Sequence, residues 1–229
     1  MIFPQQKVLP LTFPDENDDT LKESIPDLGP LHLHICKGIA FSSKYQLPLV
    51  KPEHIDVPDE ITTFYRIKKQ SKELSKKMLA HFYTADTNFE KVWNKPHLYI
   101  TPFRQLYGII SPDFSILSNM LEAQRIWNDF RNKLLAAFYQ KWNVTVIASP
   151  SWSSDIHNIE RYMEGWPHNA LISINSTGVC LDKRARKTWL DGYFAMLDIL
   201  QPTHILRYGG IIEGEKKNIS TYYVNNNRY

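Results

Sequence analysis

Two segments of the chain carry the residues that could do chemistry, and both follow one pattern. Residues 107–115 and 144–153 each begin with an apolar run of strand-forming residues that ends abruptly in Ser-Pro. Small, acidic or aromatic residues come next, with Asp113 in the first segment and Trp152 in the second. A buried parallel strand that delivers polar groups to one edge of a sheet has this pattern. Because ligands bind at that edge in open α/β sheets and in α/β barrels, we expect a site there.

Similar residues follow five predicted strands, whose ends share one edge of the sheet if the strands are parallel. Small hydroxyls, exposed N–H groups and helix N-termini at such an edge can hold an anion or a phosphate. Two carboxylates, Asp86 and Asp113, suit general acid–base chemistry or a metal ion, and they are the candidate catalytic residues. The candidate ligand-binding residues lie at strand ends or on the long helix between two strands: Ser111, Ser115, Asn128, Arg131, Ser151, Trp152, Asn175, Thr177, Gly178, Tyr208 and Gly209. Because the same residue types cap helices and form turns, a structural role stays open for each of them.

Several of these residues have two interpretations that the sequence leaves open. Trp152 could stack on a base or a sugar, or it could pack under its own loop. Asn128 and Arg131 share one face of the long helix, so the arginine could reach Asp113 or a ligand phosphate, or it could tie the helix to the sheet. Four basic residues between 183 and 187 oppose the dipole of a later helix. They could draw in an anion, although basic residues more often form a solvated surface.

The elements that must position these residues alternate between strands and helices from residue 81 onward. Strands are predicted at 81–84, 107–110, 144–149, 170–175 and 204–208, with the spacing of parallel βαβ units. Apolar residues at steps of three and four predict helices at 117–142 and 183–200. The predicted fold class is α/β, with a mostly parallel sheet of about five strands, either open or a partial barrel. Residues 1–80 are expected to form an irregular N-terminal elaboration packed on a core domain of residues 81–229.

Within residues 1–80 two elements are expected. Residues 31–35 alternate between apolar and polar types, which predicts a short strand with His32 and His34 on one face. Two such histidines could bind a metal, but no third ligand lies near them in the sequence, and no residue is assigned to a metal site. Residues 61–79 are predicted to be helical, at least from Ser71, with a basic face.

Length and composition bound the classes of function. The chain has 229 residues, of which 43% are hydrophobic and 22% charged, as in an ordinary globular protein. The net charge of +3 permits contact with a nucleotide or nucleic acid without requiring it. No apolar run is long enough for a membrane span, and Cys36 and Cys180 suggest no disulfide framework, so a cytoplasmic location is expected. Dinucleotide-binding, P-loop and standard metalloprotease motifs are absent, and the cofactor stays unknown.

The same residues resemble the signature of a known family. Residues 108–115 contain Ser-Pro-Asp-Phe-Ser, residues 127–133 are similar to a Tyr-Arg-Asn-Arg helix, and residues 146–152 are similar to a Val-Ile-Pro-x-Val-Ser-Trp strand. With residues 175–179 and the Tyr-Gly pair at 208–209, they resemble a domain-of-unknown-function family of bacteria, phages and plasmids over residues 80–210. The chain departs from the pattern at Lys133, where arginine is usual, and at Ala148 and Pro150. The resemblance implies a phage or mobile-element origin, and it carries over no catalytic residue.

These observations lead to two expectations about function. In the first, a phage or mobile-element protein binds a phosphate-bearing ligand, a nucleotide or nucleic acid, at the edge of the sheet, with Asp113 and Asp86 available for hydrolytic chemistry. In the second, the protein is a non-enzymatic binder that sequesters a nucleotide signal or blocks a host protein. The sequence leaves open the oligomeric state and the identity of the ligand.

Overall fold

Parallel strands form the centre of the protein. The computed structural model describes residues 8–9, 29–56, 60–69, 76–154, 159–177, 179, 183–216 and 221–223. Four strands form one parallel sheet, in the order β3 (Glu60–Thr63), β4 (Met78–His81), β5 (Gly108–Ile110) and β6 (Val146–Ile147). Three more form a second parallel sheet, in the order β7 (Leu171–Asn175), β8 (His204–Tyr208) and β9 (Thr221–Tyr223). A parallel bridge between Ala148 and Ile172 connects the two sheets.

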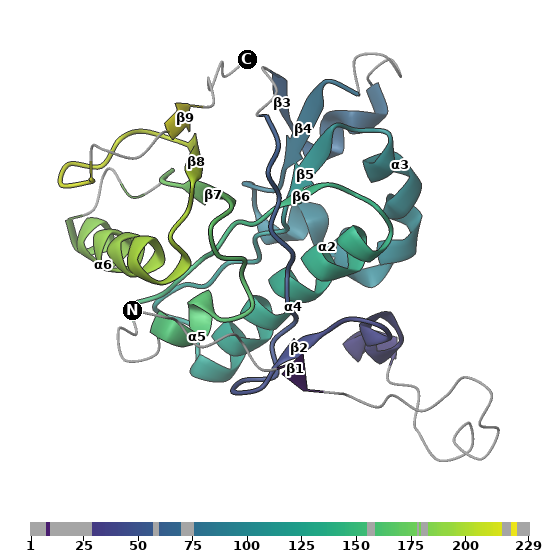
Figure 1. Cartoon of the computed structure of the whole chain (residues 1–229), viewed down its shortest axis with the longest axis horizontal. Coiled ribbons are helices and arrows are strands. Elements are labelled where there is room, and N and C mark those ends of the chain that lie inside the picture. The colour runs from purple at the N-terminus through teal and green to yellow at the C-terminus, as the bar shows by residue number, and fades with distance from the viewer. Residues whose placement is uncertain are drawn as a thin grey trace.

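The order of the strands in space follows their order in the chain, so every crossover steps in the same direction. Parallel crossovers are almost always right-handed, which places the connecting helices on one side of the strands. Figure 1 shows the early helices around the four-stranded sheet and the last helix beside β7 and β8. The helices are α2 (Asp86–Asn94), α3 (Ile100–Arg104), α4 (Glu122–Lys141), α5 (Ile159–Met163) and α6 (Lys183–Leu200). Shorter elements are the 3-10 helices η1 (Gly29–Leu31), η2 (Leu33–Cys36), η3 (Phe64–Lys69) and η4 (Pro96–Tyr99) and the antiparallel pair β1 (Val8–Leu9) and β2 (Phe41–Ser42).

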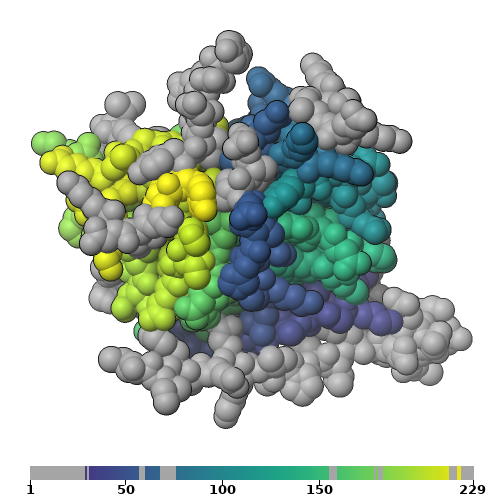
Figure 2. Space-filling model, turned by 45° about the horizontal axis from the view of Figure 1, so that its top comes forward, coloured from purple at the N-terminus to yellow at the C-terminus, as the bar shows by residue number. Residues whose placement is uncertain are grey.

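The central strands β4, β5, β6 and β7 are buried on both faces, as the continuous apolar runs predict. The larger core lies between strands and helices, and residues such as Ile109 and Val146 meet Leu134 of α4 there. A second apolar cluster covers the opposite face and includes Ile147 and Leu206. The segment 50–56 closes this face, because Ile55 packs against the cluster and Glu53 accepts a backbone hydrogen bond from Leu171. Figure 2 shows this segment in blue between the teal and yellow parts of the molecule.

The predicted α/β class with a parallel sheet is confirmed, and no closed barrel forms among the described residues. Two expectations within residues 1–80 are wrong. The described part of residues 61–79 forms β3, η3 and the start of β4 instead of a helix, because hydrogen bonding of β3 along β4 satisfies that backbone. Residues 33–36 form a 3-10 helix instead of a strand, and His32 before it has a φ of 52°.

Candidate functional site

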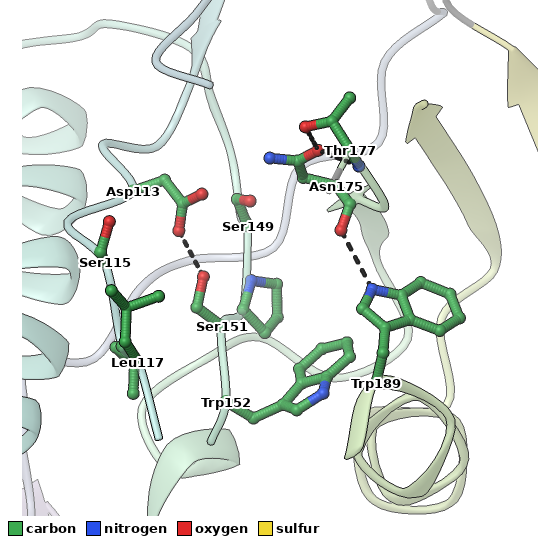
Figure 3. Close-up of a pocket in the computed structure, with 11 residues that line it drawn as sticks. Asp113, Ser115, Leu117, Ser149, Ser151, Trp152, Asn175, Thr177 and Trp189 are labelled. Atoms are coloured by element: carbon green, nitrogen blue, oxygen red, sulfur yellow. Dashed lines mark hydrogen bonds between the residues drawn. The ribbon is translucent and has the colours of Figure 1, made fainter. Parts of the chain in front are cut away.

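A cavity of about 280 Å³ opens where β5, β6 and β7 end (Figure 3). Among the described residues that line it, Asp113 alone is charged. The others have hydroxyl, amide, proline, aliphatic and tryptophan side chains: Ser115, Ile116, Leu117, Ser149, Pro150, Ser151, Trp152, Asn175, Thr177 and Trp189. A second cavity of about 610 Å³ adjoins it. The two share Ile116, Leu117, Trp152 and Trp189, and Arg184 of α6 lines the second.

Asp113 is the candidate acid of the cavity. The hydroxyl of Ser151 donates a hydrogen bond to its Oδ1 atom. Burial raises the pKa of Asp113 to about 6, the bond from Ser151 acts to lower it, and the charge of Asp86 acts to raise it. A carboxyl group with this pKa can exchange a proton near neutral pH.

The loop that carries Asp113 has no strand partner, and side chains of α4 satisfy its backbone instead. The buried amide of Asn132 accepts a hydrogen bond from the N–H of Phe114 at 2.7 Å and donates one to the C=O of Phe114 at 3.1 Å. Asn128 donates to the C=O of Ser115 at 2.7 Å. These bonds hold the residues on the carboxyl side of Asp113 in place.

Asp86 and Arg131 stabilise the same loop and are not among the residues that line the cavity. The carboxylate of Asp86, at the start of α2, accepts hydrogen bonds from the N–H of Ser115 at 3.1 Å and from its hydroxyl at 2.9 Å. The Arg131 guanidinium lies 3.6 Å from the ring centroid of Phe114 and forms an ion pair with Glu90 at 2.9 Å. Arg131 thus joins α4 to α2 and to the loop.

Two tryptophans form the opposite wall of the cavity. Trp152 lies on the loop after β6 and Trp189 lies on α6, with 6.0 Å between their ring centroids (Figure 3). Trp189 donates from Nε1 to the C=O of Asn175 at 3.0 Å, which joins α6 to the end of β7. Trp152 packs directly over Gly192, where a Cβ atom would lie only 2.1 Å from the indole. Glycine in the middle of α6 therefore makes room for the indole.

Other predicted residues lie around the cavity rather than in it. The Ser111 hydroxyl is fully buried and accepts a hydrogen bond from the N–H of Ser149 at 2.9 Å. The ring centroids of Tyr208 and Tyr83 lie 5.0 Å apart, on the face of the strands that the second apolar cluster covers. Gly209 has a φ of 104° and lies so close to Ser176 that a Cβ atom would clash, so its role is conformational. Gly178 lies outside the described residues.

Six predicted residues do come together on the cavity: Asp113, Ser115, Ser151, Trp152, Asn175 and Thr177. The prediction missed Trp189, because a tryptophan on the apolar stripe of a helix is typical of core packing, and Asn132, which shares the buried face of α4. Among the basic residues at the start of α6, Arg186 lies 3.7 Å from Glu213 and Lys187 lies 3.1 Å from Asp191.

No metal centre and no membrane span emerge from the part of the chain that the structure describes. Its histidine, cysteine and acidic residues form no group of three that could hold a metal ion. Among the described helices, none combines the length and the apolar character needed to cross a bilayer.

Comparison with known proteins identifies phage relatives. The chain is 26% identical over 168 residues to the "Gene 1 protein" of Mycobacterium phage L5, covering 73% of this chain and 72% of the relative. It is also 26% identical over 168 residues to the "Gene 1 protein" of Mycobacterium phage D29, covering 62% of that protein. No solved structure matches the chain. A family model matches residues 39–224, so the chain belongs to the family described as "Domain of unknown function (DUF4417)".

Proposed function

We propose that the two adjoining cavities bind a nucleotide, either free or as part of a nucleic acid. The observation that carries this proposal is the shared pair Trp152 and Trp189, with Asp113 beyond it on one side and Arg184 on the other. A nucleotide has a matching order of parts: a polar base edge, a planar ring and an anionic phosphate. Tryptophan rings stack on any base, and an arginine at a helix N-terminus is suited to phosphate.

The dimensions of the site support this assignment. Pockets for small ligands are clefts of about 300–1,000 Å³ with a mostly apolar lining and few convergent polar groups. The cavity beside Arg184 has about 610 Å³ and the cavity beside Asp113 about 280 Å³. Together they are large enough for a mononucleotide.

Two versions of the function follow from the same site. In the hydrolytic version, the ligand lies in the opposite orientation, with its phosphodiester or glycosidic bond beside Asp113. Asp113 then acts as general acid or base, because its raised pKa of about 6 suits proton exchange near neutral pH. In the binding version, the protein sequesters a nucleotide without changing it. The position of Asp86 favours the binding version, because its carboxylate is hydrogen-bonded to Ser115 and leaves Asp113 as the acid on the cavity. Sequestration of a nucleotide signal or action against a host protein would suit a relative of phage proteins.

Calorimetric titration with nucleoside mono- and diphosphates and with short single-stranded oligonucleotides tests the proposal. We expect at least one nucleotide to bind, and Trp152→Ala to weaken it by tenfold or more, since stacking on a base contributes about 1–3 kcal/mol. Trp142→Ala is the matched control, because Trp142 is exposed at the end of α4, away from both cavities. Chromatography of the incubated nucleotide then separates the two versions: new products indicate hydrolysis, and recovery of the intact nucleotide indicates binding. Absence of binding at about 1 mM by every nucleotide and oligonucleotide would refute the proposal.

A further inference from the structure

The floor of the smaller cavity has a fixed hydrogen-bond polarity. Tyr83, buried on the inner face, contacts the hydroxyl of Ser149 at 2.8 Å and that of Ser173 at 2.6 Å, and Ser173 donates to the C=O of Leu206 at 3.2 Å. Each hydroxyl has one proton to donate, so the three contacts can all be hydrogen bonds only if the donors follow one order along the chain. Ser173 donates to Leu206, Tyr83 donates to Ser173, and Ser149 donates to Tyr83. The Ser149 oxygen can therefore only accept a hydrogen bond from a ligand.

The other hydroxyls of the cavity are oriented in the same way. Ser151 donates its proton to Asp113, and Ser115 donates to Asp86 at 2.9 Å. Thr177 donates from Oγ1 to Oδ1 of Asn175 at 2.6 Å. Because each of these protons is already engaged within the protein, the oxygens can offer only lone pairs to the cavity.

Two charged or polar groups complete this pattern. The second carboxylate oxygen of Asp113 points into the space between Asp113 and Asn175 (Figure 3). The N–H of Thr177 bonds to Oδ1 of Asn175 at 2.9 Å, which fixes the orientation of that amide and leaves its NH₂ group toward the cavity. The smaller cavity thus offers one carboxylate and four hydroxyl oxygens as acceptors, with the Asn175 amide as a donor.

We propose that the smaller cavity binds the amino-bearing edge of a nucleobase, so that the protein selects adenine, cytosine or guanine nucleotides over their oxo counterparts. This inference rests on the proposed nucleotide binding and names the part of the ligand that meets Asp113. An amino group donates two protons to an acceptor-rich wall, and the ring nitrogen or oxygen beside it accepts from the amide of Asn175. An oxo group in the same place would put lone pairs against a carboxylate, and a phosphate would add negative charge. The phosphate therefore lies on the other side of the tryptophans, toward Arg184.

Matched ligands test this selection on the unmodified protein. Calorimetric titration would compare adenosine with inosine monophosphate, cytidine with uridine monophosphate, and guanosine with xanthosine monophosphate. In the pair with the tightest ligand, we expect the amino nucleotide to bind at least tenfold more tightly, as is usual for a site whose polar groups would otherwise be left unpaired. Equal binding of both partners, or preference for the oxo partner, would overturn this inference and leave the proposed function intact. If no nucleotide binds, both the proposed function and this inference fail.

Two variants test whether the hydrogen-bond polarity of the cavity floor causes the preference for amino nucleotides. Asp113→Asn replaces an acceptor by an amide that can also donate, so the amino-to-oxo affinity ratio should fall at least fivefold. Tyr83→Phe removes the acceptor of the Ser149 proton and frees that hydroxyl to donate, so the ratio should again fall although Tyr83 does not line the cavity. Asp198→Asn on the exposed face of α6 is the matched control and should leave the ratio unchanged. An unchanged ratio in both Asp113→Asn and Tyr83→Phe, with circular dichroism showing that both are folded, would contradict the inference.

Discussion

Replacing Gly192 by alanine tests how the tryptophan wall is built. The new Cβ atom would lie 2.1 Å from Cδ1 and Nε1 and 2.4 Å from Cε2 of Trp152, whereas ordinary van der Waals contact begins at 3.4 Å. The rigid indole must therefore move by more than 1 Å. Forcing an extra methyl group into a packed site typically costs about 1–3 kcal/mol. Alanine also favours a helix interior by about 1 kcal/mol relative to glycine, so a net destabilisation of about 1 kcal/mol is expected.

The sign of this effect should reverse when the indole is removed. In a Trp152→Ala background nothing opposes the methyl group, and Gly192→Ala should stabilise the protein by about 1 kcal/mol through helix propensity. The two substitutions should thus be coupled by about 2 kcal/mol, as expected for residues in direct contact. Equilibrium unfolding in urea, followed by far-UV circular dichroism, measures all four proteins of this cycle.

A control on the same helix separates propensity from packing. Ala195 lies one position beyond Phe194 on α6 and is not among the residues lining either cavity. Ala195→Gly should cost about 1 kcal/mol with or without Trp152. If Gly192→Ala stabilises the protein equally in both backgrounds, the indole does not pack on Gly192, and the wall of the cavity as described is incorrect.

The remaining predictions concern the acid and the buried polar residues of α4, and urea unfolding tests them. Burial raises the pKa of Asp113 to about 6, above its value in the unfolded chain, so its ionised form opposes folding. Asp113→Asn should therefore raise the urea midpoint at pH 7.5 and raise it less at pH 5. A larger gain at pH 5 than at pH 7.5 would contradict this prediction. Asn132→Ala leaves the N–H and C=O of Phe114 without partners and should cost about 2–4 kcal/mol, and a loss below 1 kcal/mol would show that the amide does not hold the loop. Lys133→Met removes the ion-pair partner of the buried Asp129 carboxylate and should lower the free energy of unfolding by about 3–5 kcal/mol. Adding Asp129→Leu should recover most of that loss. An equal or larger loss in the double variant would contradict the pairing.

The strands and helices were predictable from the sequence where their burial requires a regular pattern of apolar residues. β7 and β8 occupy residues within or equal to the predicted strands, and α6 matches its predicted range, because apolar runs and stripes mark elements buried in a core. The edge strand β3 was not predictable, because Glu60, Thr62 and Thr63 interrupt its apolar character and only pairing with β4 makes it a strand. Edge strands depend on a neighbour that lies elsewhere in the chain.

The grouping of polar residues around one cavity followed from the sequence, but the contacts that each residue makes did not. Polar residues after parallel strands led to Asp113, Trp152 and Asn175, which do line one cavity. Asp86 and Arg131 were predicted in the same way, and only the three-dimensional contacts show that they contact the loop. A residue type and a spacing identify the edge of a sheet, whereas the direction of each side chain depends on partners far away in the sequence.

The Ser-Pro-Asp-Phe-Ser segment shows how these roles divide within one motif. The Ser111 hydroxyl accepts a bond from the backbone of β6, Phe114 packs against Arg131, and the Ser115 hydroxyl donates to Asp86. In each of these residues, the polar or aromatic side chain holds the loop in place. Asp113 and Ser115 both line the cavity, but Asp113 differs because burial raises the pKa of its carboxyl group and one of its oxygens points away from Ser151. Substituting the other three should therefore lower stability and ligand affinity together, whereas substituting Asp113 should lower affinity while stability rises.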